Sequence, residues 1–343
     1  MPPDNLNITA LLGRVSGGTD LSHQEMSTAI DSMMKGGWTD QQIGVFLVGL
    51  AAKGETEVEV AGAAEALRNN MTPIRSRHAG LLDTCGTGGG GSTMFNVSTT
   101  AAIVAAATGM PVAKHGNRSI TSRSGSADVL AELGVNIHAG IEQVEACLDE
   151  LGLCFCFAPL MHPAMKHVAD VRKKLGVRTI FNILGPLANP AGACFQVLGA
   201  GRPELRPLLG GAIARLGTQR TLVVSGEDGL GDVTLAGTTH VTEVSADSTR
   251  DFTWTPEDFG INRAPLDSLS VDNPGSSAAI IRGVLAGVPG PARDIVILNA
   301  AAGLVAAGKA ADPKMAATLA AQAIDSEAAE GLLAHLAERS HSS

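Results

Sequence analysis

The feature of the sequence that most restricts its fold is a change of pattern near residue 80. Residues 1 to about 75 have no strand pattern and indicate consecutive helices. Three of these helices begin with a capping box, a Ser or Thr followed by Glu or Gln: Ser22 and Glu25, Thr39 and Gln42, and Thr56 and Glu59. After residue 80, short apolar strands alternate with helices. Within this part, residues 272–277 are predicted to form a loop and residues 338–343 a frayed tail. This order predicts an α/β fold, with a small all-helical domain and a large α/β domain whose central sheet is mainly parallel and flanked by helices.

The composition restricts what the chain can bind. Its formal net charge of −9 argues against binding to nucleic acid or to an anionic membrane, because both need a basic surface. The N-terminus has no basic stretch followed by an apolar run, so no signal peptide is expected. The five cysteines include no C-x-x-C pair. We predict that they are reduced core residues of a cytoplasmic protein rather than metal ligands.

A glycine-rich segment follows the first predicted strand. Five of the six residues from Gly86 to Gly91 are glycine, and bare glycines let a phosphate group approach backbone N–H groups closely. Ser98, Thr99 and Thr100 then begin a helix, whose positive end favours an anion. The segment therefore predicts phosphate binding, and the simpler alternative is a tight turn between a strand and a helix.

Two common phosphate-binding motifs do not fit this segment. Gly86, Gly88 and Gly91 match the G-x-G-x-x-G of dinucleotide-binding folds, but the next strand carries Lys114 where an acid should hold the ribose. A P-loop needs a lysine where this chain has Ser92. The glycines therefore indicate a phosphate loop of another kind.

Residues 113–128 form a second candidate phosphate site. Lys114, Arg118 and Arg123 precede the first acid of the segment, Asp128, and hydroxyl side chains lie between them. This local reversal of charge follows the carboxyl end of a strand, where open α/β sheets bind ligands. We interpret the segment as a cradle for a polyphosphate, and the alternative is a solvated surface loop.

Several longer motifs carry a resemblance to a known family: GTGG with FNVST, VAKHGNRS with GSADVL, FAPLMHPAMKHVADVRKKLGVRTIFNILGPLANPA, and ARDIVILNAAAGL. In this order and over essentially the whole chain, they resemble the anthranilate phosphoribosyltransferases. The resemblance implies transfer of the phosphoribosyl group of phosphoribosyl pyrophosphate (PRPP) to the amine of anthranilate, which gives N-(5-phosphoribosyl)anthranilate and pyrophosphate in tryptophan biosynthesis. It also implies the use of Mg²⁺, the fold of the nucleoside phosphorylase-like phosphoribosyltransferases, and a homodimer formed through the helical domain. We expect the helical domain to comprise residues 1–77 with part of 172–196, and the α/β domain to comprise residues 78–171 and 197–343.

The resemblance further implies the residues of the site. PRPP would be bound by Gly86, Gly88, Gly89, Gly90, Asn96, Ser98, Thr99, Lys114, Arg118, Ser119, Ser122 and Ser126. Anthranilate would be bound by Gly86, His115, Asn117 and Arg172, and the metal would lie near Ser98 and Asp232. No general base is assigned, because a weakly basic aryl amine can attack an electron-poor anomeric carbon and lose its proton afterwards.

Two of the basic residues allow a second interpretation. The planar guanidinium of Arg172 suits a carboxylate, but Arg172 could also be a solvent-facing cation beside Lys173 and Lys174. His162 precedes Pro163, and we interpret it as a structural turn residue that is satisfied locally, and not as a catalytic residue.

The chain departs from the family pattern near the expected metal and pyrophosphate. Gly90 and Gly231 stand where the family carries Asp, Met94 stands where it carries Thr, and Asp232 stands where it carries Glu. A carboxylate pair suits Mg²⁺, and the nearby Glu227 and Asp228 are candidates to compensate. Either the enzyme is active and holds the metal more loosely, or the site has drifted toward another substrate or a non-catalytic role. The complete anthranilate-side motifs favour the first hypothesis.

Two other functions are compatible with the fold. A pyrimidine nucleoside phosphorylase would attack with phosphate and would not need Arg172 to hold a benzoate. A nucleic-acid-binding relative without transferase activity would need a basic groove, which the net charge of −9 disfavours.

Overall fold

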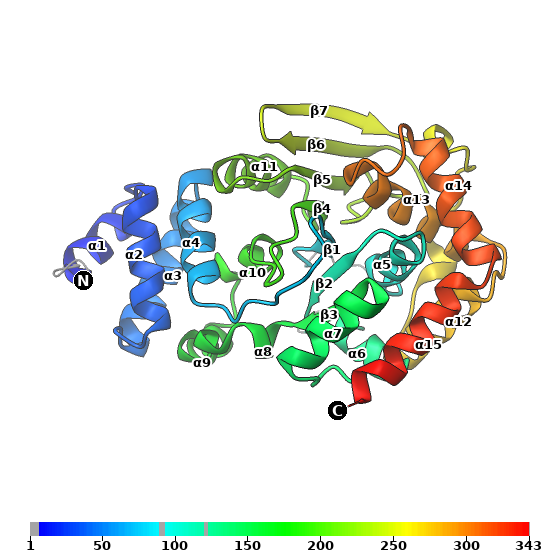
Figure 1. Cartoon of the computed structure of the whole chain (residues 1–343). Helices are drawn as coiled ribbons and strands as arrows, with labels where there is room; N and C mark the ends of the chain where they lie inside the picture. Colours follow the sequence, from blue (N-terminus) through cyan, green and yellow to red (C-terminus); the bar gives the residue numbers. More distant parts are fainter. Residues whose placement is uncertain (1–6, 89–92, 120–122, 343) are drawn as a thin grey trace.

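The computed structural model describes residues 7–88, 93–119 and 123–342. The first four helices pack at one end of the molecule: α1 (Ile8–Ser16), α2 (His23–Met34), α3 (Asp40–Lys53) and α4 (Glu57–Asn69) (Figure 1). The capping boxes predicted for α2, α3 and α4 are all present. Each box satisfies backbone N–H groups that have no partner within their own helix, so these helix starts could be predicted from local sequence.

Seven strands of the described chain form one sheet in the order β3-β2-β1-β4-β5-β6-β7. The strands are β1 (Leu82–Gly86), β2 (Val112–Gly116), β3 (Leu153–Phe157), β4 (Phe195–Gly199), β5 (Arg220–Gly226), β6 (Thr239–Ser245) and β7 (Thr249–Trp254). Strands β1 to β5 pair in parallel, whereas β6 and β7 are antiparallel. The structure confirms the predicted α/β fold with a mainly parallel sheet.

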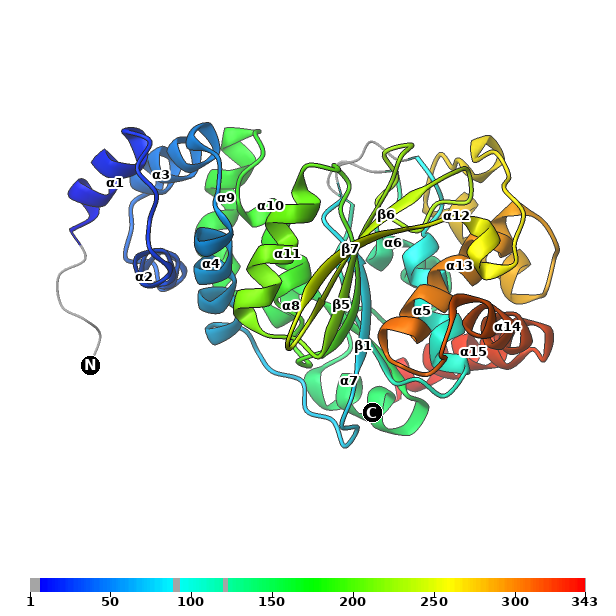
Figure 2. The ribbon, with the colours of Figure 1, turned by 90° about the horizontal axis from the view of Figure 1, so that it is seen from above.

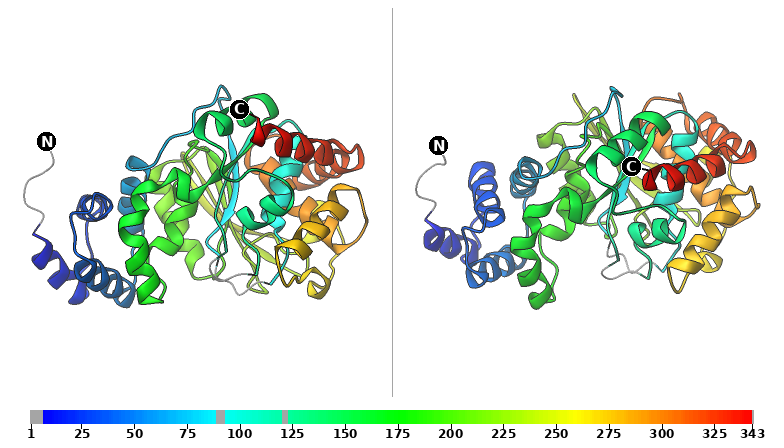
Figure 3. Two further views of the ribbon diagram at one scale, coloured as in Figure 1. Left: turned by 90° about the horizontal axis from the view of Figure 1, so that it is seen from below. Right: turned by 60° about the horizontal axis from the view of Figure 1, so that its bottom comes forward.

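Helices cover both faces of the sheet (Figure 2). On one side lie α5 (Val97–Ala107), α6 (Ser126–Glu132), α12 (Pro274–Leu285), α13 (Pro291–Ala306), α14 (Pro313–Asp325) and α15 (Ala328–His341). On the other side lie α8 (Ala158–Met161), α9 (Lys166–Leu175), α10 (Phe181–Leu184) and α11 (Leu205–Leu216). Helix α7 (Ile141–Leu151) packs against β3 and α15. Short 3₁₀ turns span Pro163–Met165, Gly185–Leu187, Pro256–Phe259 and Asp267–Leu269. The C-terminal helix α15 therefore lies across the sheet from the N-terminal helices (Figure 3).

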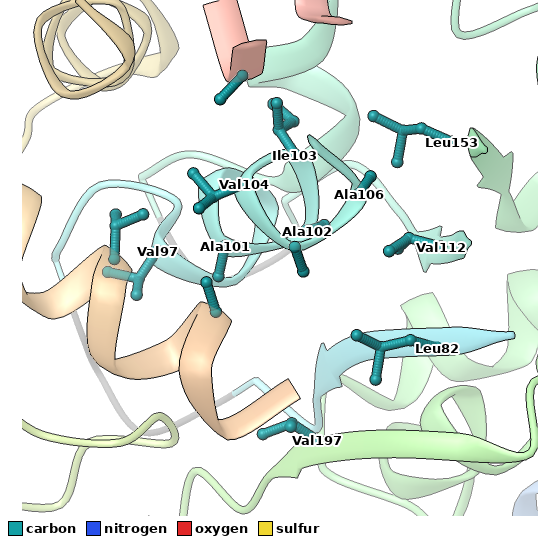
Figure 4. Close-up of a cluster of buried hydrophobic side chains, with 14 of the residues drawn as sticks. Leu82, Val97, Ala101, Ala102, Ile103, Val104, Ala106, Val112, Leu153 and Val197 are labelled. Atoms are coloured by element: carbon teal, nitrogen blue, oxygen red, sulfur yellow. The ribbon is translucent and has the colours of Figure 1, made fainter. Parts of the chain in front are cut away.

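The main core lies between α5 and the first four strands (Figure 4). Leu82 of β1, Val112 of β2 and Leu153 of β3 are buried with the alanine-rich face of α5. Alanine side chains let a helix approach a sheet closely, so dense packing is reached in a chain with only 3% aromatic residues.

A second core joins the N-terminal helices to α9, α10 and α11. Val168 and Val171 of α9, Leu184 of α10 and Leu209 of α11 are buried in the same cluster as the apolar side chains of α1 to α4. This packing supports joining part of residues 172–196 to the helical unit. The domain boundaries themselves stay a prediction.

The segment 272–277 was predicted to be a loop, and that prediction is wrong. Helix α12 begins at Pro274, and the side chain of Asn273 accepts a hydrogen bond from the Ser276 N–H at 2.9 Å. Proline is well tolerated in the first turn of a helix, where its missing N–H has no partner to lose.

The predicted frayed tail at residues 338–343 is also wrong for the residues described. Helix α15 continues to His341, and Arg339 forms an ion pair with Glu150. The Ser340 hydroxyl is buried and accepts a hydrogen bond from the Asn136 N–H at 2.9 Å. Contacts with a distant part of the chain hold this end, and local sequence carries no signal for them.

The cysteine thiols are free, and Cys147, Cys154 and Cys156 are buried in the core. Within residues 7–88, 93–119 and 123–342, no group of three or more His, Cys, Asp or Glu side chains could hold a metal ion. Among the described helices, none combines the length and the apolar character needed to cross a bilayer.

Alternation along the strands gives the two sheet faces different chemistry. On the α5 face, Lys114 of β2 reaches the first turn of α5. On the opposite face, His115 of β2 and Gln196 of β4 contact the backbone of the segment 185–190. The side chains of the consecutive residues Lys114 and His115 therefore lie on opposite faces of the sheet.

Side chains on this second face hold the segment 185–190 in place. Gln196 Nε2 donates to the Pro186 carbonyl at 2.7 Å, and Asn189 Nδ2 donates to the Ala113 carbonyl at 2.8 Å. From the helical unit, Arg68 Nε donates to the Leu187 carbonyl at 2.7 Å. This segment does not pair with a strand, so these side chains supply the hydrogen bonds that its buried backbone groups require.

Two buried histidines complete this layer. His115 Nδ1 lies 3.2 Å from the Gly185 carbonyl, which only a protonated nitrogen can satisfy. His115 Nε2 is then the acceptor for His162 Nε2, at 3.3 Å. Burial lowers the pKa of His115 to about 4 and the pKa of His162 to about 3, so both rings are neutral at neutral pH. The side chain of His162 thus contacts a residue distant in sequence, and not a local partner as expected.

This pair predicts a pH-dependent stability. Histidine in the unfolded chain has a pKa of about 6.5, so below that pH the unfolded chain takes up protons that the folded chain excludes. The free energy of unfolding is therefore highest above about pH 6.5 and falls as the pH decreases toward 4. At pH 5, each histidine lowers it by roughly 2 kcal/mol relative to its value at neutral pH. His162→Gln, which keeps a donor for His115, should remove about half of this loss in urea unfolding followed by tryptophan fluorescence.

His335→Gln serves as the matched control, because His335 is exposed on α15. This variant should keep the wild-type dependence of stability on pH. An unchanged pH dependence in the His162→Gln variant would show that the buried pair is not the cause.

Candidate functional site

The candidate site lies where the strand order reverses. Strand β1 is flanked by β2 and β4, and the chain builds β2 and β3 on one side before it returns to β4 on the other. Such a reversal opens a crevice at the carboxyl ends of the strands, where α/β sheets bind ligands. The Thr87 N–H donates to the Gly199 carbonyl at 2.9 Å, and the Gly201 N–H donates to Thr87 Oγ1 at 3.1 Å. These bonds fix the start of the glycine-rich segment against the end of β4.

The predicted phosphate loop begins beside this contact. Gly86 ends β1, and Gly88 has a φ of +63°, a conformation that favours glycine. Gly89, Gly90 and Ser122, which were also predicted to bind PRPP, lie outside the described residues.

A small pocket at the carboxyl ends of β1 and β4 brings the two predicted metal residues together. It is lined by Thr84, Cys85, Ser98, Ala101, Val197, Gly199, Asp232 and Asn299. Ser98 comes from the first turn of α5, and Asp232 comes from the loop after β5. The pocket therefore combines a hydroxyl and a carboxylate with the positive end of a helix.

Lys114 places a buried cation beside this pocket. The residue is only 3% exposed, and its Nζ donates to the Thr84 carbonyl at 2.5 Å and lies 3.4 Å from Ser98 Oγ. Desolvation lowers the pKa of Lys114, while the charges of Asp83 and Asp232 oppose this effect. An anion bound at Ser98 would supply further compensating charge.

Asp232 is the acid that lines this pocket. Burial, with a smaller contribution from the nearby Asp228, raises its pKa to about 7, although the charge of Lys114 opposes this shift. Asp228 accepts hydrogen bonds from the Leu230 N–H and the Thr234 hydroxyl. Glu227 accepts one from the Thr238 N–H at 2.9 Å. Both of these neighbouring acids thus stabilise their own loop, and neither lines the pocket.

Gly231 belongs to a tight crossing of two loops. A Cβ atom at Gly199 would lie 1.7 Å from the Gly231 carbonyl oxygen, so only glycine fits at position 199. A Cβ atom at Gly231 would lie 3.1 Å from the Gly201 N and Cα atoms. A side chain at position 231 therefore needs only a small shift of the backbone at Gly201.

Asn96 connects three segments of the site. Its Oδ1 accepts from the Ser124 hydroxyl at 2.7 Å and from the Ser277 hydroxyl at 2.9 Å. Its Nδ2 donates to the Ser124 carbonyl, and its N–H donates to Ser277 Oγ. Sequence reasoning missed Ser277, because its segment was predicted to be a loop and the residue bonds across 181 positions of sequence.

The basic segment is less positive than its sequence indicated. Arg118 pairs with Asp128 at 2.9 Å, and Arg123 pairs with Asp272. The Ser119 N–H also donates to Asp128. Lys114 is therefore the cation of this segment that remains without a salt bridge among the described residues.

The remaining predicted PRPP residues lie at helix starts. Thr99 is buried in the first turn of α5. Ser126 is the first residue of α6, and its hydroxyl donates to the Asn117 carbonyl at 3.3 Å. Asn117 itself is exposed just beyond β2.

On the other face of the sheet, Arg172 differs from its neighbours. Its guanidinium carbon lies 5.4 Å from the centre of the Phe181 ring, and burial lowers its pKa. Lys173 and Lys174 are exposed, and Lys174 pairs with Asp40. Arg172 is therefore partly buried and stacked on an aromatic ring, and it is not a fully solvent-facing cation like its two neighbours. His115, in contrast, has both ring nitrogens engaged in the buried layer.

Comparison with known proteins agrees with this geometry. Residues 9–71 match the helical bundle domain of a glycosyl transferase family, and residues 78–330 match its a/b domain. The chain is 46% identical to the anthranilate phosphoribosyltransferase of Rhodopirellula baltica, covering 97% of this chain and 98% of that one. It is 49% identical to the enzyme of an Anaeromyxobacter species, covering 96% and 97%.

Solved structures are similar over the same length. The crystal structure of the Thermus thermophilus anthranilate phosphoribosyltransferase has a TM-score of 0.91 and 42% identity, covering 96% of this chain and 99% of that one. The Saccharomyces cerevisiae enzyme in complex with PRPP and Mg has a TM-score of 0.88 and 27% identity, covering 98% of each chain. The same enzyme in complex with 4-fluoroanthranilate has a TM-score of 0.87 and 26% identity, covering 98% and 99%. With both domains matched and the likeness extending over nearly its full length, the chain belongs to the anthranilate phosphoribosyltransferase family and has that family's activity in tryptophan biosynthesis.

Proposed function

We propose that this chain transfers the phosphoribosyl group of PRPP to the amine of anthranilate at the crevice between β1 and β4, with the two substrates held from opposite faces of the sheet. The observation that carries this proposal is the alternation of β2, which sends Lys114 to the α5 face and His115 to the opposite face. The yeast relative, in complex with PRPP and Mg or with 4-fluoroanthranilate, supports the choice of substrates.

On the PRPP side, the proposed contacts neutralise a diphosphate. Lys114 supplies a cation beside Ser98, and the first turn of α5 supplies backbone N–H groups at the positive end of a helix. Gly86 and Gly88 let the phosphates approach the backbone. Asn96 has one Nδ2 hydrogen left for a phosphate, so its main role is to hold three segments together. The proposed contacts of Ser119 and Ser126 would complete the phosphate cradle.

Ser98 and Asp232 fit a weakly held Mg²⁺. They are hard oxygen donors that line one pocket, and Mg²⁺ binds with one or two protein ligands while it keeps waters and substrate phosphates. When bound, the ion would offset negative charge on the leaving pyrophosphate. Because Glu227 and Asp228 bond within their own loop, we assign the protein carboxylate of this site to Asp232 alone.

The chain's own residues then act mainly by position and charge. Loss of pyrophosphate leaves positive character at the anomeric carbon, and Lys114 stabilises the departing anion. The aryl amine attacks this carbon from the other side of the crevice and loses its proton afterwards, so no general base is needed. Holding both reactants in one orientation supplies most of the remaining acceleration.

On the acceptor side, we assign the anthranilate carboxylate to Arg172 and propose Asn117 and Gly86 as further anthranilate contacts. The guanidinium stacks on Phe181, which fixes its plane. His115 takes an indirect role in place of the predicted contact with anthranilate, because its ring nitrogens bond to Gly185 and His162.

We further propose that the chain forms a homodimer through its helical unit and acts in the cytoplasm. A groove along α1, α3 and α9 is lined by Val15, Ser16, Gly17, Gly18, Gly44, Val45, Val48, Gly49, Ala52, Lys53 and Leu175. Val45 is 50% exposed and Val48 is 45% exposed. Neighbouring exposed apolar side chains of this kind mark surfaces that a partner covers.

Arg172→Ala should raise the KM for anthranilate about tenfold or more while the KM for PRPP changes little. The reason is that a charge-assisted hydrogen bond to the carboxylate contributes about 1.5–3 kcal/mol. Steady-state kinetics with each substrate varied in turn would measure both constants. Lys173→Ala, an exposed neighbour, is the control and should behave as wild type. Equal increases in both KM values would contradict the assignment.

Gly231→Asp restores an acidic pair and should lower the Mg²⁺ concentration needed for half-maximal activity on the order of tenfold, because each added carboxylate strengthens a Mg²⁺ site. Asp232→Asn should raise that concentration. The measurement is a Mg²⁺ titration of phosphoribosylanthranilate formation, with thermal unfolding to check the packing at Gly201.

Glu227→Gln is the control for this titration, because Glu227 bonds to its own loop. It should leave the Mg²⁺ requirement unchanged. If Asp232→Asn has the same requirement as wild type, Asp232 does not serve the metal.

Val48→Asp should produce a monomer, because a carboxylate in an apolar interface loses its hydration without gaining a partner. Light scattering after gel filtration would report the mass of one 34.9 kDa chain. Val288→Asp alters a valine that is 57% exposed elsewhere and should leave the mass at two chains. A wild-type protein that is monomeric at micromolar concentration would refute the proposal.

A further inference from the structure

Asn299 of α13 is a polar residue of the pocket to which the mechanism above gives no role. It belongs to the motif ARDIVILNAAAGL and is 3% exposed. It lines the same pocket as Ser98 and Asp232. A buried amide in an apolar helix is costly unless its polar atoms have partners, so its contacts indicate what it does.

Each polar group of the Asn299 side chain has a backbone partner. Oδ1 accepts from the Val233 N–H at 2.8 Å, and Nδ2 donates to the Val233 carbonyl at 2.9 Å. The second hydrogen of Nδ2 goes to the Ile295 carbonyl at 2.9 Å, one turn earlier in α13. The amide has two donors and both are used, so no N–H of Asn299 remains to contact a ligand.

These bonds act on the residue next to Asp232. The Val233 N–H lies in the same rigid peptide plane as the Asp232 carbonyl, so fixing Val233 restricts rotation of the backbone that carries the Asp232 side chain. The loop from Gly226 to Thr239 has no strand partner at Val233, and Asn299 supplies the two hydrogen bonds that a neighbouring strand would supply. The bond to Ile295 holds the amide itself against rotation.

We propose that Asn299 is a positioning residue that sets the Asp232 carboxylate toward Ser98 and thereby determines how tightly Mg²⁺ is held. This inference rests on the proposed role of Asp232. Positioning by Asn299 matters more in this chain than in a site with two acids. Gly231 contributes no carboxylate, so metal binding depends on where the backbone places the carboxylate of Asp232. Residues that orient metal ligands commonly change metal affinity about 10–100-fold when replaced.

The test compares Asn299→Leu, Asp232→Asn and the double variant with wild type. Isothermal titration calorimetry of PRPP over a range of Mg²⁺ concentrations gives the Mg²⁺ concentration at which PRPP binding is half-maximally strengthened. Asn299→Leu should raise this concentration about tenfold or more, and kcat at saturating Mg²⁺ should change much less. The double variant should be no worse than Asp232→Asn, because the two residues act through one carboxylate.

Leu304→Ala is the matched control, since Leu304 is fully buried on the same helix and does not line the pocket. It should lower the unfolding temperature and leave the Mg²⁺ requirement unchanged. If Asn299→Leu does not fold, Asn299→Ser leaves space for water to hydrate the Val233 backbone and replaces it in the series.

The outcomes separate this inference from the proposed function. If Asn299→Leu needs no more Mg²⁺ than Leu304→Ala, or if its effect adds fully to that of Asp232→Asn, Asn299 is a structural residue and the inference is overturned. If Asp232→Asn itself has the wild-type requirement, the proposed role of Asp232 fails first and the inference fails with it.

Discussion

The site depends on the pairing of β1 with β2 and β4 at the point where the strand order reverses. Parallel pairing brings three carboxyl ends to one edge, and the period of two along β2 then sends Lys114 and His115 to opposite faces. A one-residue slip of β2 would exchange these two side chains. The register of one five-residue strand therefore decides which face offers a cation to phosphate and which face carries the neutral histidine layer.

The buried polar groups on the two faces of the sheet differ in charge. On the α5 face, Lys114 lies next to the pocket that Ser98 and Asp232 line, and an anion bound there would compensate its charge. On the other face, His115 and His162 are neutral and their hydrogen bonds are internal. A charge-poor layer of this kind suits a wall behind a planar aromatic acceptor, whose single carboxylate we propose to be bound by Arg172. The distribution of charge thus matches a highly anionic donor and a weakly polar acceptor.

Sequence reasoning predicted elements whose signals are local. The capping boxes and the alternation of strands and helices each follow from a few neighbouring residues. The errors fall where distant contacts decide the outcome: Ser340 is ordered by Asn136, and Ser277 bonds to Asn96. The pairing of Arg118 with Asp128 was also missed, although the acid was visible in sequence. The distance in space between the Arg118 and Asp128 side chains could not be derived from the sequence pattern.

The resemblance to the family implies an acid at position 231, and the structure gives a geometric reason that favours glycine there. The Gly231 backbone crosses the end of β4 so closely that Gly199 admits no side chain, and a side chain at Gly231 would press on Gly201. A glycine at position 231 relaxes this crossing. It also leaves Asp232, whose pKa is raised to about 7 mainly by burial, as the acid that lines the pocket. A second acid beside Asp232 would add like-charge repulsion in the absence of metal, and it would strengthen the proposed Mg²⁺ site when the ion is bound. If Asp232 is the one protein carboxylate of the proposed site, metal affinity depends on how firmly the backbone around Asp232 is held, and Asn299 holds that backbone through Val233.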